Sequence, residues 1–444
     1  MGHKSKLGLF DVTMIVVSLV IGMGIFKTPA TVAQKAGTPG IFFLAWVLGG
    51  VIALCGALTY AEIGSRYPVT GGYYKIFSYC YHPAFAFMIN GIILVSNAAS
   101  TSAVALIGAE YINALILPVA WHTVAAKQVV AIIAVLIFYG VNLLGLKMSA
   151  RTQNVLTLLK IGMVTVLIFA LFGNYKAAPA AGSFIDLSPG WAGYLKAFGI
   201  SLIAVSFTYG GYQQTINFGG EVKNANKVIP RAIFFGLAII VSLYLLINYA
   251  YFRVIGFENL KTADSIAATL AKVIFGPTGD AVFRILLFFA VLAYVNVQLM
   301  SNPRVMYAMG EDGVLPPLFK KKSDKNEVLI TALTCFSAIS IITLFFSGAF
   351  DRILNYTIFL DSFGMTTSAA TIFILRKRTR HLDQSQIYRM RLYPLLPVIF
   401  IGAYLLVCIS IIFSDKMAAL SGFLIFLGFY PLYKLFSSRW FKKQ

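Results

Sequence analysis

The chain is poor in charge, in cysteine and in histidine. Only 12% of its 444 residues are charged, and Asp and Glu together number 16. A soluble domain carries about twice that share of charged residues. The four cysteines and four histidines show no metal-ligand spacing, so the sequence predicts no metal site and no cofactor. No grouping of catalytic side chains is visible either, which argues against an enzyme.

Hydrophobic residues, by contrast, make up 59% of the chain. They form about twelve segments of roughly the length that crosses a bilayer, and no stretch remains for a sizeable soluble domain. The sequence therefore predicts an all-α polytopic membrane protein, with residues 1–444 forming a single transmembrane domain.

The net charge of +20 does not indicate a nucleic-acid partner, because the basic residues follow the membrane topology. Most lysines and arginines fall at the two ends and in alternate loops. By the positive-inside rule, both termini are expected in the cytoplasm of a protein of the cell membrane. The expected partners are the lipid bilayer and a small-molecule substrate. The chain is expected as a monomer or homodimer, and nothing in it indicates a single-span partner chain.

Glycine interrupts the first and the sixth segment, at residues 21–25 (Ile-Gly-Met-Gly-Ile) and 208–212 (Thr-Tyr-Gly-Gly-Tyr). Unwound backbone is tolerated inside a membrane only where it is buried in protein or lines a cavity. Two breaks in corresponding positions point to the binding site of a transporter. Packing of helices through small residues is the alternative. The aromatic neighbours Phe207, Tyr209 and Tyr212 favour the binding site.

The two breaks also predict the chemistry of the ligand. Unwinding leaves N–H donors at the start of one half-helix and C=O acceptors at the end of the other. The donors suit a carboxylate and the acceptors suit an ammonium group. Facing breaks would therefore receive the zwitterionic end of an amino acid.

The five-segment interval between the breaks predicts an inverted repeat, because an odd number of spans reverses the second copy. Residues 7–173 would form helices 1–5, and residues 195–378 would form helices 6–10, with helices 1 and 6 discontinuous. Residues 392–436 would add two C-terminal helices outside the repeat.

Two charged residues stand inside apolar segments, where charge is costly and is a functional hypothesis by default. Lys160 either extends its ammonium group to the interface or supplies a fixed positive charge where relatives of the same architecture bind sodium. Asp361 is a pocket acceptor, a protonatable group or a structural hydrogen-bond hub, and the sequence leaves these three open.

Several motifs stand in register between residues 7 and 380. They are Ile-Gly-Met-Gly-Ile-Phe-Lys-Thr-Pro at 21–29, Ala-Gly-Thr-Pro-Gly at 36–40, Gly-Ala-Leu-Thr-Tyr-Ala-Glu-Ile-Gly at 56–64, Gly-Gly-Tyr-Tyr at 71–74, Phe-Thr-Tyr-Gly-Gly-Tyr-Gln at 207–213 and Pro-Arg-Val-Met-Tyr-Ala-Met at 303–309. Together they resemble the amino acid–polyamine–organocation superfamily, and within it the L-amino-acid transporter branch, as a bacterial amino acid permease.

The resemblance implies sodium-independent amino-acid transport, often as exchange. Backbone at Gly22, Met23 and Gly24 would hold the substrate carboxylate. Carbonyls near Phe207 and Gly210 would take the amino group, with Phe207 as an aromatic gate. The residues expected to bind substrate are Ile21, Gly22, Met23, Gly24, Ile25, Phe207, Thr208, Tyr209, Gly210, Gln213 and Asp361. Lys160 would link helices 1 and 8.

The chain departs from this family pattern at three positions. Met23 stands where a serine or small residue is usual, which could remove a hydroxyl contact, and Tyr212 and Gln213 replace the commoner tryptophan and asparagine. The sequence thus predicts an amino-acid transporter working by alternating access. A proton-coupled permease for amines, polyamines or amino acids and a non-transporting nutrient sensor are the alternatives.

Overall fold

The computed structural model describes residues 7–22, 24–116, 118, 121–173, 190–263, 266–324, 326–346, 350–414 and 416–440. The longer helices are α1 (Leu9–Val20), α2 (Gly24–Ala36), α3 (Pro39–Arg66), α4 (Gly72–Cys80), α5 (Pro83–Ile116), α6 (Val124–Leu143), α7 (Leu146–Ile168), α8 (Gly190–Thr208), α9 (Ala225–Ile255), α11 (Ile266–Glu311), α12 (Ile330–Leu344), α13 (Phe350–Arg378), α14 (Leu395–Ser414) and α15 (Lys416–Trp440). Short elements join them: η2 (Phe169–Phe172), η3 (Tyr212–Asn217), η4 (Gly219–Glu221), α10 (Phe257–Lys261), η5 (Pro317–Lys320) and η7 (Gln384–Gln386).

These elements confirm the all-α polytopic fold. Eight stretches of the described chain are long and apolar enough to cross a membrane, the first being α1 and α2 taken together. The other four predicted spans correspond to α7, α8 with η3, α12 and α13. Each of these four departs from a long, uninterrupted apolar helix. The helix α12 has only 15 residues, and α8 ends at the second break. The helices α7 and α13 carry internal charge in Lys160 and Asp361.

Familiar local signals set the helix boundaries. The helix α3 starts where Thr38 accepts a hydrogen bond from the Ile41 N–H, with Pro39 in the first turn. Gly145, at φ +100°, separates α6 from α7. The long α11 is two helices joined at Gly276, where φ is +70°.

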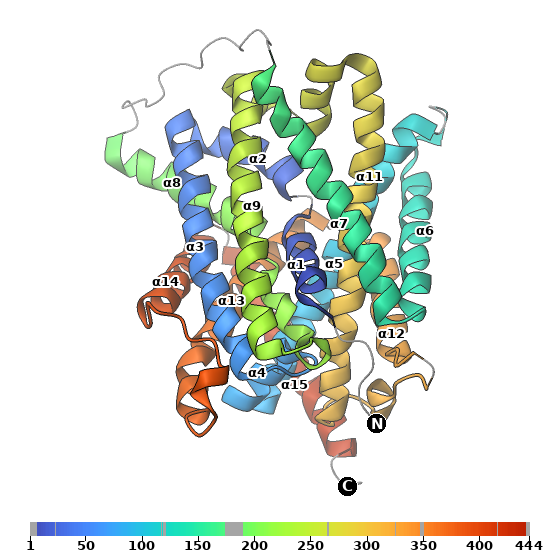
Figure 1. Ribbon diagram of the computed structural model, residues 1–444, viewed down its shortest axis with the longest axis vertical. Coiled ribbons are helices and arrows are strands. Elements are labelled where there is room, and N and C mark those ends of the chain that lie inside the picture. The colour runs from blue at the N-terminus through green and yellow to red at the C-terminus, as the bar shows by residue number, and fades with distance from the viewer. Residues whose placement is uncertain are drawn as a thin grey trace.

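The broken helix α1–α2 occupies the middle of the bundle (Figure 1). The half α1 packs against α7, α9 and α11, and the half α2 lies above it and packs against α8. The helices α3 and α9 pack against each other, as do α5 and α11. Under the predicted repeat, α3 would be the counterpart of α9, and α5 the counterpart of α11. The repeat itself stays a prediction.

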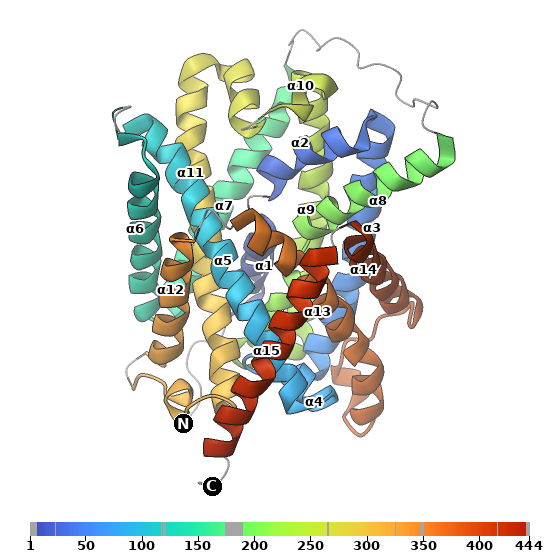
Figure 2. The ribbon, with the colours of Figure 1, turned by 180° about the vertical axis from the view of Figure 1, so that it is seen from behind.

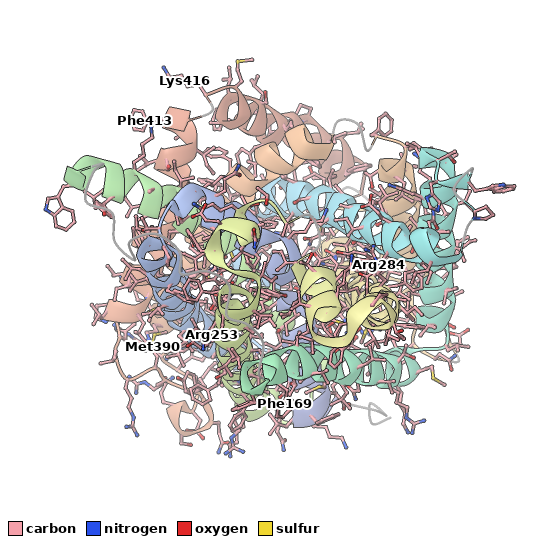
Figure 3. All side chains as sticks on the ribbon, turned by 90° about the horizontal axis from the view of Figure 1, so that it is seen from above. Phe169, Arg253, Arg284, Met390, Phe413 and Lys416 are labelled. Carbon is pink, nitrogen blue, oxygen red and sulfur yellow. The ribbon has the colours of Figure 1, made fainter. Side chains whose placement is uncertain are left out.

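The last two helices lie on the outside of the bundle. Figure 2 shows α15 crossing the face formed by α5 and α13, and α15 packs against both. Seen from above in Figure 3, Phe413 and Lys416 stand at the rim of the molecule, where Phe413 is 78% exposed. Of these two helices, α14 reaches the second break, through Tyr404 and Val407.

Candidate functional site

The two breaks lie against each other in the centre of the molecule. Gly211 has φ +116°, and a β-carbon there would overlap the carbonyl oxygen of Leu19. A β-carbon at Gly24 would lie 2.7 Å from Cγ2 of Thr208. Only glycine allows these approaches, because any side chain would push the two half-helices apart. The structure thus explains why both interruptions contain glycine.

The first break offers its N–H groups at the start of α2. The N–H of Gly22 is already bonded to the Val20 carbonyl oxygen at 2.8 Å. The first-turn N–H groups of α2, from Gly24 onward, have no partner within the helix. They and the positive end of the helix dipole suit a carboxylate. Met23 lies outside the described residues.

At the second break, the side chains of two predicted site residues form hydrogen bonds with the backbone. The Gln213 side chain accepts a 2.9 Å hydrogen bond from the Gly211 N–H and so supports the turn. The Tyr209 hydroxyl donates to the Trp46 carbonyl oxygen at 3.4 Å, and its ring is 1% exposed. Neither residue lines the cavity at this break.

The other predicted residues beside the breaks fall into two groups. Phe207 is 43% exposed and, with Gly210, lines a small cavity. Thr208 is buried against Gly24 and bonds to its own helix at the Ala204 carbonyl oxygen, 2.9 Å away. Ile25 is fully buried in the core. Phe207 and Gly210 therefore face open space, whereas Thr208 and Ile25 pack.

Lys160 is fully buried on α7, and its ammonium group donates to the carbonyl oxygen of Ile21. The Tyr244 hydroxyl of α9 donates to the neighbouring carbonyl of Val20 at 3.1 Å. Two helices thereby hold the last carbonyls of α1, which lack a helical partner. The lysine does not extend to the interface. Its predicted link from helix 1 is present at Ile21, while no bond from it to α11 is seen among the described residues.

Asp361 is brought to the second break from α13. It lines a cavity of about 10 Å³, room for roughly one water molecule, together with Phe207 and Gly210. The other lining residues are Ile203, Ser206, Ser362, Tyr404 and Val407. The structure therefore places the one carboxylate predicted for the pocket at the mouth of the α8 break.

Three tyrosines that were not predicted as site residues lie beside the breaks: Tyr244, Tyr294 and Tyr404. A β-carbon at Gly22 would lie 3.4 Å from the ring of Tyr294. Tyr404 donates to the Ser206 carbonyl oxygen at 3.4 Å, and Tyr244 holds Val20 as described. Tyrosine in an apolar helix is an ordinary packing residue, so the sequence carries no signal that would have separated these three from the rest.

A larger cavity of about 860 Å³ opens at the end of the molecule where α3, α6 and α11 end. Arg304 lines it and forms an ion pair with Glu221 at 2.5 Å. Between this cavity and Tyr294, α11 carries Asn296, whose amide bonds to Gln153 at 2.8 Å and to Asn142 at 2.9 Å. Polar side chains thus connect α6, α7 and α11 between the cavity and the breaks.

Two broken helices that meet at their unwound centres, with a buried lysine of α7 bonded to one and a carboxylate of α13 beside the other, define a secondary transporter. The amino acid permease family matches residues 7–439, and the chain belongs to that family. The predictions of the superfamily, of the fold and of amino-acid transport are thereby confirmed.

Individual relatives cover almost the whole chain. It is 29% identical to the serine/threonine exchanger SteT of Bacillus subtilis, over 97% of each chain. It is 27% identical to the human cystine/glutamate transporter, over 99% of this chain and 87% of that one. The methylthioribose transporter of Bacillus subtilis is 26% identical, over 95% and 91%. Relatives of nearly equal identity thus carry the names of different substrates. Their names therefore do not indicate which substrate this chain selects.

Proposed function

We propose that the chain exchanges amino acids across the cell membrane by alternating access, without sodium. The first-turn N–H groups of α2 hold the substrate carboxylate, and carbonyl oxygens at the end of α8 hold the amino group. Phe207 covers the bound molecule as a gate. The observation that carries this proposal is the direct contact between the breaks, Gly24 against Thr208 and Gly211 against Leu19.

The sodium independence rests on Lys160. Its ammonium group is fully buried and satisfies the Ile21 carbonyl, which a bound cation would otherwise have to do. A fixed positive charge there also repels a second cation. Exchange is supported by the likeness to SteT, which is named as an exchanger. The substrate crosses chemically unchanged in this proposal, which the likeness to proteins named as transporters and exchangers supports.

The orientation follows from the charge pattern. The basic connectors place α1's start and α15's end on the cytoplasmic side, and both lie toward the lower end in Figure 1. We further propose a monomer or homodimer without a single-span partner. The four cysteines lie in helices and form no disulfide, and three of them are buried. They therefore offer little for a covalent link to another chain.

Ligand-induced stabilisation of the purified chain tests the position of the site. We expect the melting temperature to rise with a transported amino acid, and Gly210→Val to lose that rise because the added side chain blocks the carbonyls. Gly199→Val is the matched control, since Gly199 lies on α8, ahead of the break, with nothing within 4 Å of an added β-carbon. An undiminished rise in Gly210→Val would place the amino group elsewhere.

A further inference from the structure

Asp361 is a carboxylate without a counter-ion. The ion pairs between described residues use the carboxylates of Glu62, Glu110, Glu221, Glu258, Asp280, Glu311 and Asp312, and none of them includes Asp361. The ammonium group of Lys160 is bonded to the Ile21 carbonyl instead. Within the described part of the chain, the Asp361 carboxyl group therefore has no cationic side chain paired with it.

The hydroxyl groups around Asp361 are bonded elsewhere. The phenols of Tyr73, Tyr294 and Tyr404 lie within electrostatic reach of its carboxylate. Tyr404 donates to the Ser206 carbonyl oxygen, and Tyr73 shares a 3.1 Å hydrogen bond with Ser368. These neighbours could have formed a closed hydrogen-bond hub around the carboxylate. No hydrogen bond from these hydroxyl groups to Asp361 is seen among the described residues, so nothing there supports the structural role considered for Asp361.

The carboxylate lies at the second break, on the side of the cavity lined by α13. It shares a cavity with Phe207 and Gly210 of the α8 break. It also lies within electrostatic reach of Tyr294, whose ring stands beside Gly22 of the first break. A molecule held at both breaks by its carboxylate and amino groups would therefore direct its side chain toward α11 and α13, where Asp361 lies.

We infer that the substrate supplies the missing positive charge: an amino acid with a cationic side chain, such as arginine or lysine, whose terminal group pairs with Asp361. This inference rests on the proposed transport function and names its substrate class. A carboxylate inside the membrane-spanning part of a protein is costly unless it is paired or coordinates a cation. A cationic side chain removes that cost during each occupied half-cycle, and a neutral side chain leaves it in place.

The test compares two pairs of amino acids that differ in side-chain charge at similar length: arginine with citrulline, and lysine with norleucine. The full chain is reconstituted in liposomes loaded with arginine, and each amino acid competes with external labelled arginine. The same competition is run with internal leucine and labelled leucine, so that neutral exchange is measured separately. We expect arginine and lysine to compete at concentrations about tenfold or more below those of their neutral partners, as charge-assisted pairing would give.

Three variants assign the preference to the carboxylate. In Asp361→Asn, the concentrations at which citrulline and arginine compete should differ by no more than about twofold, because a neutral amide of the same shape forms no ion pair. Asp361→Glu should retain the preference. Asp280→Asn is the control, the same substitution at a carboxylate that pairs with Arg284 on α11 and does not line this cavity. Because the ratio in the unmodified chain is measured independently, the inference stays testable even if Asp361→Asn does not fold.

The failures are distinguishable. Equal competition by citrulline and arginine in the unmodified chain overturns the substrate class while transport stands. A preference that persists in a folded Asp361→Asn protein overturns the role of the carboxylate. Loss of uptake driven by a proton gradient in Asp361→Asn, with the preference unchanged, makes Asp361 a proton site and likewise overturns it. If neither labelled leucine nor labelled arginine exchanges, the proposed function itself fails.

Discussion

Replacing Lys160 with methionine should slow exchange while leaving the fold intact. Methionine fills a similar volume but cannot donate to the Ile21 carbonyl. A hydrogen bond from a charged donor contributes about 1.5–3 kcal/mol. Since about 1.4 kcal/mol corresponds to a factor of ten, the exchange rate should fall about 10- to 100-fold. Removing a buried charge also removes its desolvation cost, so the global free energy of unfolding should change little.

The assay is initial-rate exchange in proteoliposomes, with the melting temperature of the purified protein measured in parallel. The control is Lys272→Met, the same substitution at an exposed lysine on α11, which should leave the rate unchanged. An unchanged exchange rate in Lys160→Met would refute the reasoning that this ammonium group holds the first break. A large fall in melting temperature with a proportionate loss of active protein would instead make Lys160 a folding residue.

Three further substitutions probe the supports of the site. Gly211→Ala should abolish exchange, since its β-carbon would overlap the Leu19 carbonyl oxygen and φ is +116°; the exchange rate in proteoliposomes measures this loss. Tyr244→Phe removes one neutral hydrogen bond from α1, worth about 1 kcal/mol, and should lower the exchange rate about fivefold. Glu62→Gln should destabilise the fold by about 3–5 kcal/mol, read as a lower melting temperature, because its buried carboxylate pairs with Arg66 and Arg376 at 2.7 Å.

The expectations for Gly211 and Glu62 each have a contrast in the same chain. Gly402→Ala should transport normally, since nothing lies within 4 Å of its added β-carbon. Glu110→Gln breaks an exposed pair with Lys127 and should cost no more than about 1 kcal/mol. Equal effects at Glu62 and Glu110, or normal transport by Gly211→Ala, would contradict the account of burial and close approach given above.

The fold class and the breaks could be predicted from the sequence because both have strong one-dimensional signals. Apolar runs of bilayer length identify spans, and glycine inside such a run marks an unwound centre. The positions of Gly24 and Gly211 against the opposite half-helix follow from those signals. Lys160 was recognised for a similar reason, since a charge in an apolar run is rare enough to be informative.

Side-chain directions around the breaks could not be predicted. Helical and strand periodicity relate sequence to direction only in regular structure, and the residues after Thr208 are not regular. Hence Tyr209 and Gln213 were expected in the pocket, although their side chains bond to Trp46 and to the Gly211 N–H. Tyr294 was missed because its proximity to Gly22 depends on how α11 packs, which one chain's sequence does not state.

In the proposed function, the facing breaks bind an amino acid on one side of the membrane and release it on the other in exchange for a second one. The most direct measurement is uptake of labelled amino acid into proteoliposomes, without sodium or a proton gradient, with and without unlabelled amino acid inside. We expect uptake into loaded vesicles and almost none into empty ones. Equal uptake by empty and loaded vesicles, or uptake only when a proton gradient is imposed, would contradict it.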